Sequence, residues 1–252
     1  MTSQLRFDFP GGARAQAVDV GDVNELLSAL TRLGLTPPRP TLVVVGGAGG
    51  LDGAGIERLR PLIETGIVPV LERFGAAAVD GGTLSGVMRM LGEARWALGA
   101  AFPLVGVVAE GTVEVPGRPA PPGAQVLEPH HSHFVIVPGG QWGAEAPWIA
   151  HTATVLAGAA PSITVLINGG AIAYLDIERS LQAGRRVVVI AGSGRTADVI
   201  ASALAGTGSD ERAQALTQSG LVGSVPVDDP SALAELLAST LGEASAEGRL
   251  RS

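Results

Sequence analysis

The chain has 252 residues, of which 46% are hydrophobic, and it carries a formal net charge of −7 at pH 7. This length suffices for a full buried core, while the acidic charge argues against general nucleic-acid binding, which needs a basic surface. All 17 lysine and arginine positions are arginines and there is no cysteine, which excludes disulfides, thiolate chemistry, P-loops and Schiff-base lysines.

No apolar stretch approaches the roughly 18 to 20 residues that a membrane span needs, and the N-terminus lacks a signal-peptide pattern. We therefore expect a cytoplasmic protein without a membrane span.

The first 40 residues form an N-terminal segment whose pattern differs from that of the rest of the chain. Apolar and polar residues alternate over Leu5–Phe9 and Ala15–Val20, which predicts two short strands, and Asp22 is expected to cap a helix after them. Three prolines within Thr36–Pro40 then end the helix. We interpret residues 1–40 as an extension packed on a main domain over residues 41–242, followed by a flexible tail over residues 243–252.

From Thr41 the chain repeats one pattern, a short apolar run that ends at glycines. The runs are Leu42–Val45 before Gly46 and Gly47, Ala76–Asp80 before Gly81 and Gly82, Phe134–Pro138 before Gly139 and Gly140, Ile163–Asn168 before Gly169 and Gly170, and Val187–Ala191 before Gly192, Ser193 and Gly194. Such runs are typical of parallel strands buried on both faces. Their glycines then lie at the carboxyl edge of the sheet, where α/β proteins bind ligands.

Helical periodicity separates these runs. Helices are expected after Gly50, in two pieces because of Pro61, Gly66 and Pro69, after Gly86, over Ala144–Leu156 and Leu175–Ala183, after Gly194, and over Ala232–Leu241. The Pro- and Gly-rich segment Gly111–His130 shows no periodicity and is expected to be a functional or mobile loop. The predicted fold class is α/β, a Rossmann-like three-layer α/β/α sandwich with a mostly parallel central sheet.

The turn Asp80–Val87 has the richest chemistry. A helix that begins near Ser85 would direct free N–H groups at a phosphate, and Thr83 and Ser85 would add hydroxyl donors. The alternative is a tight turn in which Ser85 only caps the helix. A dinucleotide fingerprint that starts at Gly47 fails, because Asp52 stands where the third glycine is needed.

Two further turns carry candidate ligand groups. Arg195 follows a strand end and is the preferred anion clamp, with a surface arginine as the alternative. Trp142 could stack on a base or ribose, and Glu145 could bind ribose hydroxyls or act as an acid or base. The alternatives are core packing for Trp142 and a favourable helix-dipole charge for Glu145.

Three histidines, His130, His131 and His133, precede one strand. His131 and His133 would share one face of a strand and could meet a metal. No carboxylate–histidine arrangement completes a familiar site, so no metal is expected. We expect instead that one histidine packs in the core and one bonds a loop carbonyl.

Four motifs in order resemble a known family. The strings V-D-G-G-T-L-S-G-V-M (79–88), L-E-P-H-H-S-H-F-V-I-V (127–137), L-I-N-G-G-A-I (166–172) and V-I-A-G-S-G-R-T-A-D-V-I-A (189–201) resemble the SLOG superfamily. Within it they are similar to the LSDAT branch, the domain at the cytosolic N-terminus of TRPM channels that also occurs alone in prokaryotes. The resemblance covers about residues 40–205.

The resemblance implies a Rossmann-like domain that binds a small nucleotide-derived ligand, ADP-ribose or a related NAD metabolite, with no further cofactor required. It implies that phosphate or ribose is held by Gly81, Gly82, Thr83, Ser85 and Gly86, that a second wall is formed by Gly192, Ser193, Gly194 and Arg195, and a third by Gly140, Trp142, Gly143 and Glu145. The remaining strand-end candidates are Gly46, Gly47, Gly139, Asn168, Gly169 and Gly170.

Two other functions stay open. LOG-type phosphoribohydrolases have motifs similar to Pro138–Gly140 with Glu145, so the alternative is a hydrolase that cleaves a ribosyl or phosphate bond of a nucleotide, with Glu145 as catalytic carboxylate and Asp80 as a second. A scaffold that has lost its ligand is the third hypothesis. A homo-oligomer is left open, because the helix with Trp96 and Leu98 could be core or dimer surface.

Overall fold

A computed structural model describes residues 4–47, 49 and 52–242. The flexible tail predicted for residues 243–252 lies outside the described residues. The fold class is confirmed: a nine-stranded sheet has the order β1-β2-β8-β5-β4-β3-β9-β10-β11, and every neighbouring pair is parallel except β1 and β2. The strands are β1 (Gln4–Asp8), β2 (Arg14–Asp19), β3 (Thr41–Gly46), β4 (Ala77–Asp80), β5 (Leu104–Ala109), β8 (His133–Val137), β9 (Ser162–Ile167), β10 (Arg186–Ala191) and β11 (Val222–Pro226).

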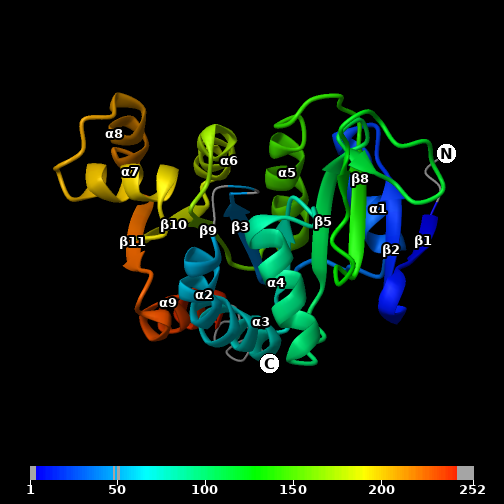
Figure 1. The fold of residues 1–252 in the computed structure, drawn as a ribbon, viewed down its shortest axis with the longest axis horizontal. Helices are drawn as coiled ribbons and strands as arrows, with labels where there is room; N and C mark the ends of the chain where they lie inside the picture. The colour runs from blue at the N-terminus through cyan, green and yellow to red at the C-terminus, as the bar shows by residue number, and fades with distance from the viewer. Residues whose placement is uncertain (1–3, 48, 50–51, 243–252) are drawn as a thin grey trace.

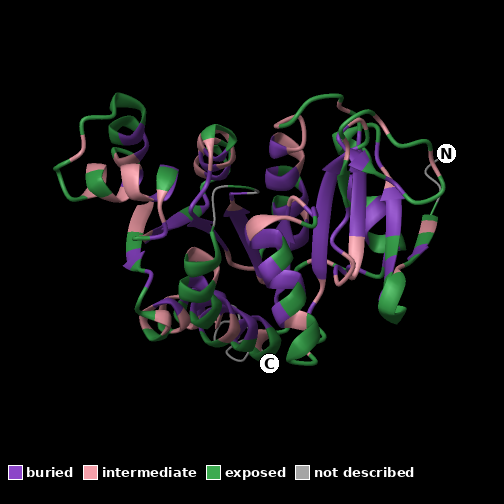
Figure 2. Ribbon diagram, viewed as in Figure 1, coloured by how far each residue is buried: buried purple, intermediate pink, exposed green. Residues whose placement is uncertain are grey.

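Helices cover both faces of the sheet (Figure 1). One face carries α1 (Leu26–Arg32), α5 (Ala146–Ala157), α6 (Ala171–Gln182), α7 (Arg195–Leu204) and α8 (Glu211–Thr217). The other carries α2 (Gly53–Pro61), α3 (Val68–Phe74), α4 (Gly86–Ala97) and α9 (Pro230–Gly242). Side chains of β3 alternate between the two layers, with Val43 and Val45 in the first core and Leu42 and Val44 in the second. The inner strands are therefore buried on both faces (Figure 2).

Two helix predictions need correction. The segment expected to break into two helices stays helical throughout, because a π-helix over Leu62–Ile67 joins α2 to α3. Its apolar side chains pack in one core cluster with those of α9, so tertiary packing overrides the breaking effect of Pro61. Helix α6 begins at Ala171 rather than Leu175, and Ala173 of its first turn is buried in the core.

The N-terminal segment is built into the same sheet. Strands β1 and β2 pair as an antiparallel hairpin, and β2 joins β8 with Gln16 opposite His133. Asp22 accepts a hydrogen bond from the amide of Asn24 at 2.8 Å, so it caps the 3-10 turn Val23–Glu25 that leads into α1. Helix α1 then packs in the same core cluster as α5.

The segment between β5 and β8 is a long loop with two short paired strands, β6 (Val113–Glu114) and β7 (Gln125–Val126). It buries Val113 and Leu127 against Phe134 of β8 in a small third core cluster. Arg118 of this loop donates to both carboxylate oxygens of Asp19 at 2.6 and 2.7 Å. Apolar packing and an ion pair therefore both hold this loop against the sheet.

The order of the strands creates a switch point. The chain runs outward from β3 through β4 and β5 to β8, then crosses back by α5 to place β9 on the other side of β3. The connections after β3 and β9 therefore diverge, which leaves a crevice at the carboxyl edge between the two strands. Helices α4, α5, α6 and α7 all begin at this edge, and none of the described helices is long and apolar enough to cross a membrane.

Candidate functional site

A cavity of about 570 Å³ opens at this switch point. Its lining includes the end of β3, the start of α6, the turn after β4, the start of α5 and Arg195. The predicted site residues that line it are Gly46, Gly47, Gly81, Thr83, Trp142, Glu145, Gly170 and Arg195. Sequence reasoning missed Val44, Val45, Gly49, Met88, Ile149, Ala171, Ile172, Ala173 and Asp176, which line it as well.

The other predicted site residues lie outside this lining. They are Gly82, Ser85, Gly86, Gly139, Gly140, Gly143, Asn168, Gly169, Gly192, Ser193 and Gly194. Several of them are held by hydrogen bonds, as Asn168 and Ser193 are, or are packed so closely that an added Cβ would clash, as at Gly82 and Gly139.

Asn168 and Ser193 hydrogen-bond to each other. The Asn168 amide N–H donates to the Ser193 hydroxyl at 2.8 Å, and the Asn168 side chain donates to the Ser193 carbonyl at 2.8 Å. The Ser193 hydroxyl in turn donates to Ile190 at 2.6 Å. These groups are therefore used in joining the ends of β9 and β10, which fixes the position of α6 relative to α7.

Arg195 provides positive charge at the mouth of the cavity. Its side chain is exposed and donates to the carbonyl of Gly49 at 2.8 Å, and a Cβ added at Gly170 would lie 2.9 Å from its guanidinium. Among the described residues it forms no ion pair. The N-terminus of α6 adjoins it, so this end of the cavity suits an anion.

Unusual backbone conformations occur in the loops that follow β9 and β10. Asn168 and Arg195 are the described residues other than glycine with positive φ, at 61° and 53°. Such residues are uncommon, and they concentrate at functional sites because the surrounding structure must hold them in place. Both stand next to the switch point, at the end of β9 and the start of α7.

Trp142 lines the cavity on the α5 side and is 47% exposed. The alternative of core packing therefore does not apply to this residue. A half-exposed indole beside a cavity offers a flat surface on which a base or sugar can stack.

Two carboxyl groups lie together in the wall between α5 and α6. Both carboxylate oxygens of Glu145 accept from the amide of Gly143, at 3.0 and 3.1 Å. Asp176 of α6 is half-buried, and its enclosed Oδ1 has no hydrogen-bond partner in the described part of the chain. Burial raises the pKa of Glu145, and burial together with the nearby Glu145 charge raises the pKa of Asp176 to about 8. At neutral pH Asp176 therefore keeps its proton and lies near the Glu145 carboxyl group.

Asp80, expected as a second catalytic carboxylate, lies elsewhere. It is fully buried, does not line the cavity, and accepts hydrogen bonds from the amide of Gly82 and from His131, both at 2.8 Å. Ser85 occupies the N-cap position of α4, but its hydroxyl contacts that of Thr83 at 3.0 Å instead of capping the helix.

The histidines serve different roles. His131 is buried between Asp80 and Glu128, whereas burial lowers the pKa of His133 to about 4 despite a backbone hydrogen bond with Leu33. In the part of the chain that the structure describes, no group of three or more His, Asp or Glu side chains could hold a metal ion.

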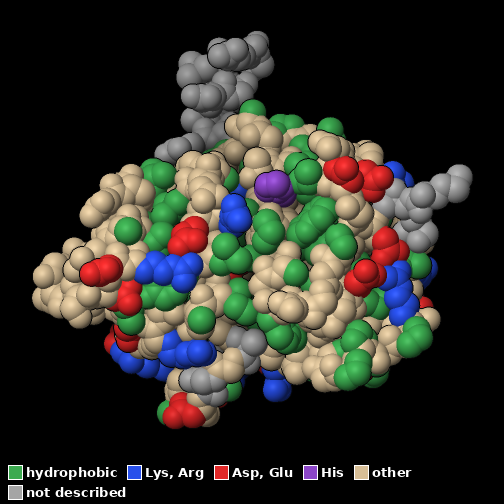
Figure 3. Space-filling model, turned by 90° about the horizontal axis from the view of Figure 1, so that it is seen from above, with side chains coloured by type: hydrophobic (Ala, Val, Ile, Leu, Met, Phe, Trp, Pro, Cys, Tyr) green, Lys and Arg blue, Asp and Glu red, His purple; other side chains and the backbone are tan. Residues whose placement is uncertain are grey.

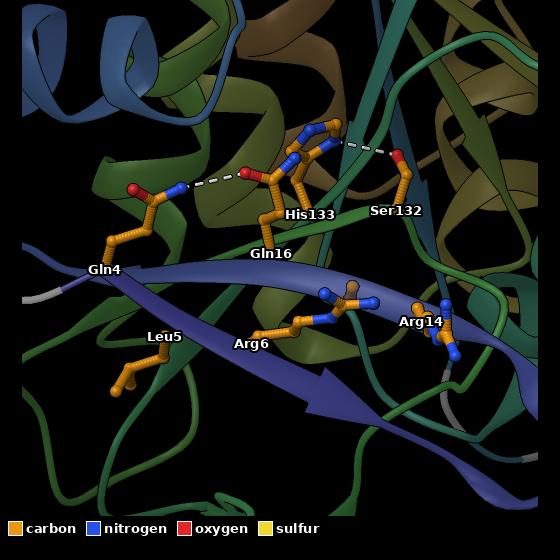
Figure 4. Close-up of a pocket in the computed structure, with 8 residues that line it drawn as sticks. Gln4, Leu5, Arg6, Arg14, Gln16, Ser132 and His133 are labelled. Atoms are coloured by element: carbon orange, nitrogen blue, oxygen red, sulfur yellow. Dashed lines mark hydrogen bonds between the residues drawn. The ribbon is translucent and has the colours of Figure 1, made fainter.

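A second hollow, of about 630 Å³, lies beside the β1–β2 hairpin and the start of β8 (Figure 4). Four of its polar groups already contact each other, since Gln4 donates to Gln16 at 2.9 Å and Ser132 contacts His133 at 2.8 Å. It lies away from the switch point.

The face seen in Figure 3 has acidic and basic side chains interspersed, with no single basic patch.

The comparisons with known proteins point to one family. The protein-family model LSDAT_prok, described as SLOG in TRPM, prokaryote, matches residues 39–235. Transient receptor potential cation channel subfamily M member 2 of Mus musculus is 28% identical over 207 residues, which cover 67% of this chain and 13% of the channel. The protein of the same name from Rattus norvegicus is 29% identical over 208 residues, 68% of this chain and 14% of the channel.

This chain therefore spans only a small part of the length of these relatives. Among solved structures, the structural genomics target TM1055 matches with a TM-score of 0.50 and 21% identity, over 78% of this chain and 99% of that one. This match supports the fold alone.

Proposed function

The chain belongs to the LSDAT_prok family, SLOG in TRPM, prokaryote, and on this basis we propose that it is a sensor that binds a nucleotide-derived ligand, ADP-ribose or a related NAD metabolite. The binding site is the cavity at the switch point, where α/β proteins hold such ligands. One observation carries the proposal: Arg195, which has no ion-pair partner among the described residues, and the exposed Trp142 line the same cavity as the glycine turns.

The chemistry of ADP-ribose fits the two ends of this cavity. Its diphosphate takes the end formed by Arg195, Gly47 and the start of α6, where a guanidinium and backbone N–H groups favour an anion. Its base stacks on Trp142. Its ribose hydroxyls form hydrogen bonds with the carboxyl groups of Glu145 and Asp176. The apolar side chains Met88 and Ile149 complete the floor.

The test is titration calorimetry with ADP-ribose, together with thermal shift, on the wild type and Arg195→Ala. A charge-assisted hydrogen bond contributes about 1.5–3 kcal/mol, so we expect the dissociation constant of the variant to rise about 10- to 150-fold. Arg179→Ala is the matched control, because Arg179 lies on α6 and donates to Gln182 away from the cavity. Equal affinities of wild type and Arg195→Ala, or no binding of any nucleotide by the wild type, would contradict the proposal.

The paired carboxyl groups favour a second candidate function, hydrolysis of the ribosyl bond of a nucleotide. Glycoside hydrolysis needs one protonated and one ionised carboxyl near the scissile bond. Asp176 would give its proton to the departing base, Glu145 would take a proton from the attacking water, and the products would be free base and ribose phosphate. Asp176, rather than Asp80, is thus the partner of Glu145 in this candidate.

The two functions are separated by recovering the ligand. A sensor returns ADP-ribose or AMP intact after incubation, whereas a hydrolase releases free adenine that chromatography detects. With a hydrolase, Glu145→Gln stops this release and leaves binding in place. Intact recovery of both nucleotides by a wild type that binds them would reject hydrolysis.

A further inference from the structure

Three ionisable side chains form a fully buried network outside the cavity. They are Asp80 at the end of β4, Glu128 in the loop before β8, and His131, each 0% exposed. The His131 ring approaches a carboxylate oxygen through both nitrogens: Nε2 lies 2.8 Å from Asp80 and Nδ1 lies 2.8 Å from Glu128. An ionised carboxylate only accepts hydrogen bonds, so both ring nitrogens must donate, and the ring is an imidazolium.

Two other ionisable side chains, His130 and Arg95, lie beside this network. His130 contacts Glu128 through its ring at 2.7 Å and its backbone amide at 2.9 Å, and Arg95 of α4 donates to the carbonyl of His130 at 3.1 Å. Arg95 also interacts electrostatically with Glu128 and Glu72. Burial opposes the charge on His131, but Asp80 and then Glu128 raise its pKa to about 9, so it stays protonated at neutral pH.

The network holds the turn that follows β4, residues 81–85, which we call the ligand turn. Asp80 Oδ1 accepts from the amide of Gly82 as well as from His131, and the amide of Glu128 donates to the carbonyl of Gly82 at 2.9 Å. The amide of Leu84 donates to Val126 at 2.8 Å. Gly81 and Thr83 of this turn line the cavity, so the buried network fixes one wall of it.

The charge of Asp80 poses a problem for an anionic ligand. The carboxylate directly precedes the ligand turn, and a nearby negative charge repels a phosphate. A purely apolar contact would support the turn without the desolvation of three ions, which is costly. The imidazolium explains why the carboxylate is tolerated, because its positive charge lies against the same oxygen that accepts from Gly82.

We propose that His131 is a positioning residue for the ligand turn: its imidazolium holds Asp80 against the Gly82 amide and offsets the Asp80 charge next to a site for a phosphorylated ligand. This inference rests on the proposed function for its ligand, but the geometry of the turn can be tested without one. His131 does not touch the cavity, so it acts through Asp80 and the turn.

The first measurement is the ring ¹⁵N NMR spectrum of His131 in the wild-type protein at pH 7. Protons on both ring nitrogens are expected. A neutral ring would overturn the proposal, and this result needs no variant.

The second measurement is the affinity for ADP-ribose of His131→Gln and of Asp80→Asn/His131→Gln. The single variant leaves the Asp80 charge uncompensated, so its affinity should be at least tenfold lower than that of the wild type. The double variant also removes that charge, so its affinity should be at least threefold higher than that of the single variant. His133→Gln is the control, because His133 is a half-buried histidine in the same segment that contacts neither carboxylate of the network. A single variant within twofold of the wild type, or a double variant with no recovery, overturns the proposal.

The third measurement is the hydrogen exchange rate of the Gly82 amide in His131→Gln, compared with slowly exchanging amides of β3. We expect the Gly82 rate to rise at least tenfold more than theirs, and a parallel change overturns the positioning role. If the wild type does not bind ADP-ribose, the ligand proposal fails while this exchange result still decides the positioning role. If His131→Gln does not fold, Asp80→Asn takes its place in the exchange measurement.

Discussion

Replacing Asp176 with asparagine should raise the free energy of unfolding at pH 8, because the folded protein disfavours ionisation of this side chain. Burial and the neighbouring Glu145 charge raise its pKa from 3.8 to about 8. The folded state therefore keeps a proton that the unfolded chain loses above about pH 4. Stability should fall as pH rises from about 4 to 8 in the wild type, because the folded state binds more protons over that range.

The size of the effect follows from the pKa difference. Each tenfold change in acidity corresponds to about 1.4 kcal/mol, so a pKa rise from 3.8 to about 8 corresponds to an upper limit of roughly 6 kcal/mol. Because Asp176 lines an open cavity, water screens part of this penalty, and we expect a gain of about 1–3 kcal/mol for Asp176→Asn at pH 8. For a protein of this size that raises Tm by about 2–4 °C per kcal/mol.

Urea unfolding at half-unit intervals from pH 4.5 to 8.5 measures the effect. The stability difference between Asp176→Asn and the wild type should be near zero at the acid end and grow toward pH 8. Glu178→Gln removes one carboxylate from the same helix, at a surface position paired with Arg212 at 2.8 Å, and controls for net charge. Parallel pH curves for Asp176→Asn and wild type, or equal changes in slope for Asp176→Asn and Glu178→Gln, would refute the reasoning.

Two other changes test the site and the core. Trp142→Ala should lower the affinity for ADP-ribose about 5- to 150-fold, since stacking on a base contributes about 1–3 kcal/mol, and Trp142→Phe should keep most of the affinity; calorimetry that finds no loss would remove Trp142 from the site. A Cβ added at Gly92 of α4 would overlap the carboxylate of Glu128, so Gly92→Ala should destabilise the protein by about 1–3 kcal/mol in urea. Gly53→Ala, where a Cβ meets nothing within 4 Å, is its control, and equal stabilities of the two variants would contradict the packing argument.

The sequence predicted most strands of the sheet because their signal is local, but it missed the edge strand β11. A run such as Val187–Ala191 has apolar residues at successive positions, as a strand buried on both faces requires. Its shortness, its valines and the glycines that follow favour a strand over a buried helix. The order of strands is not local. That β9 returns to the other side of β3, and so creates the switch point, depends on how the layers pack and was not predicted.

The site was predicted only in part, for reasons that particular residues show. Asp176 stands in the middle of a helix, where an acid resembles a solvated surface group, and only the packing of α6 against α5 brings it beside Glu145. Asp80 and His131 are 51 residues apart in sequence. Asn168 and Ser193 have the chemistry of ligand-binding groups, but they hydrogen-bond to each other.

The two outer strands of the sheet differ from the rest in a way that matters for aggregation. Strand β1 presents Arg6 and Asp8 at alternate exposed positions, with side chains 63% and 70% exposed, and β11 ends in Pro226, which has no amide proton to donate. A strand from another molecule that added to either side would meet charges at one and lose a hydrogen bond at the other. The seven strands between them can therefore be strongly apolar while the protein avoids growing into fibrils through its sheet.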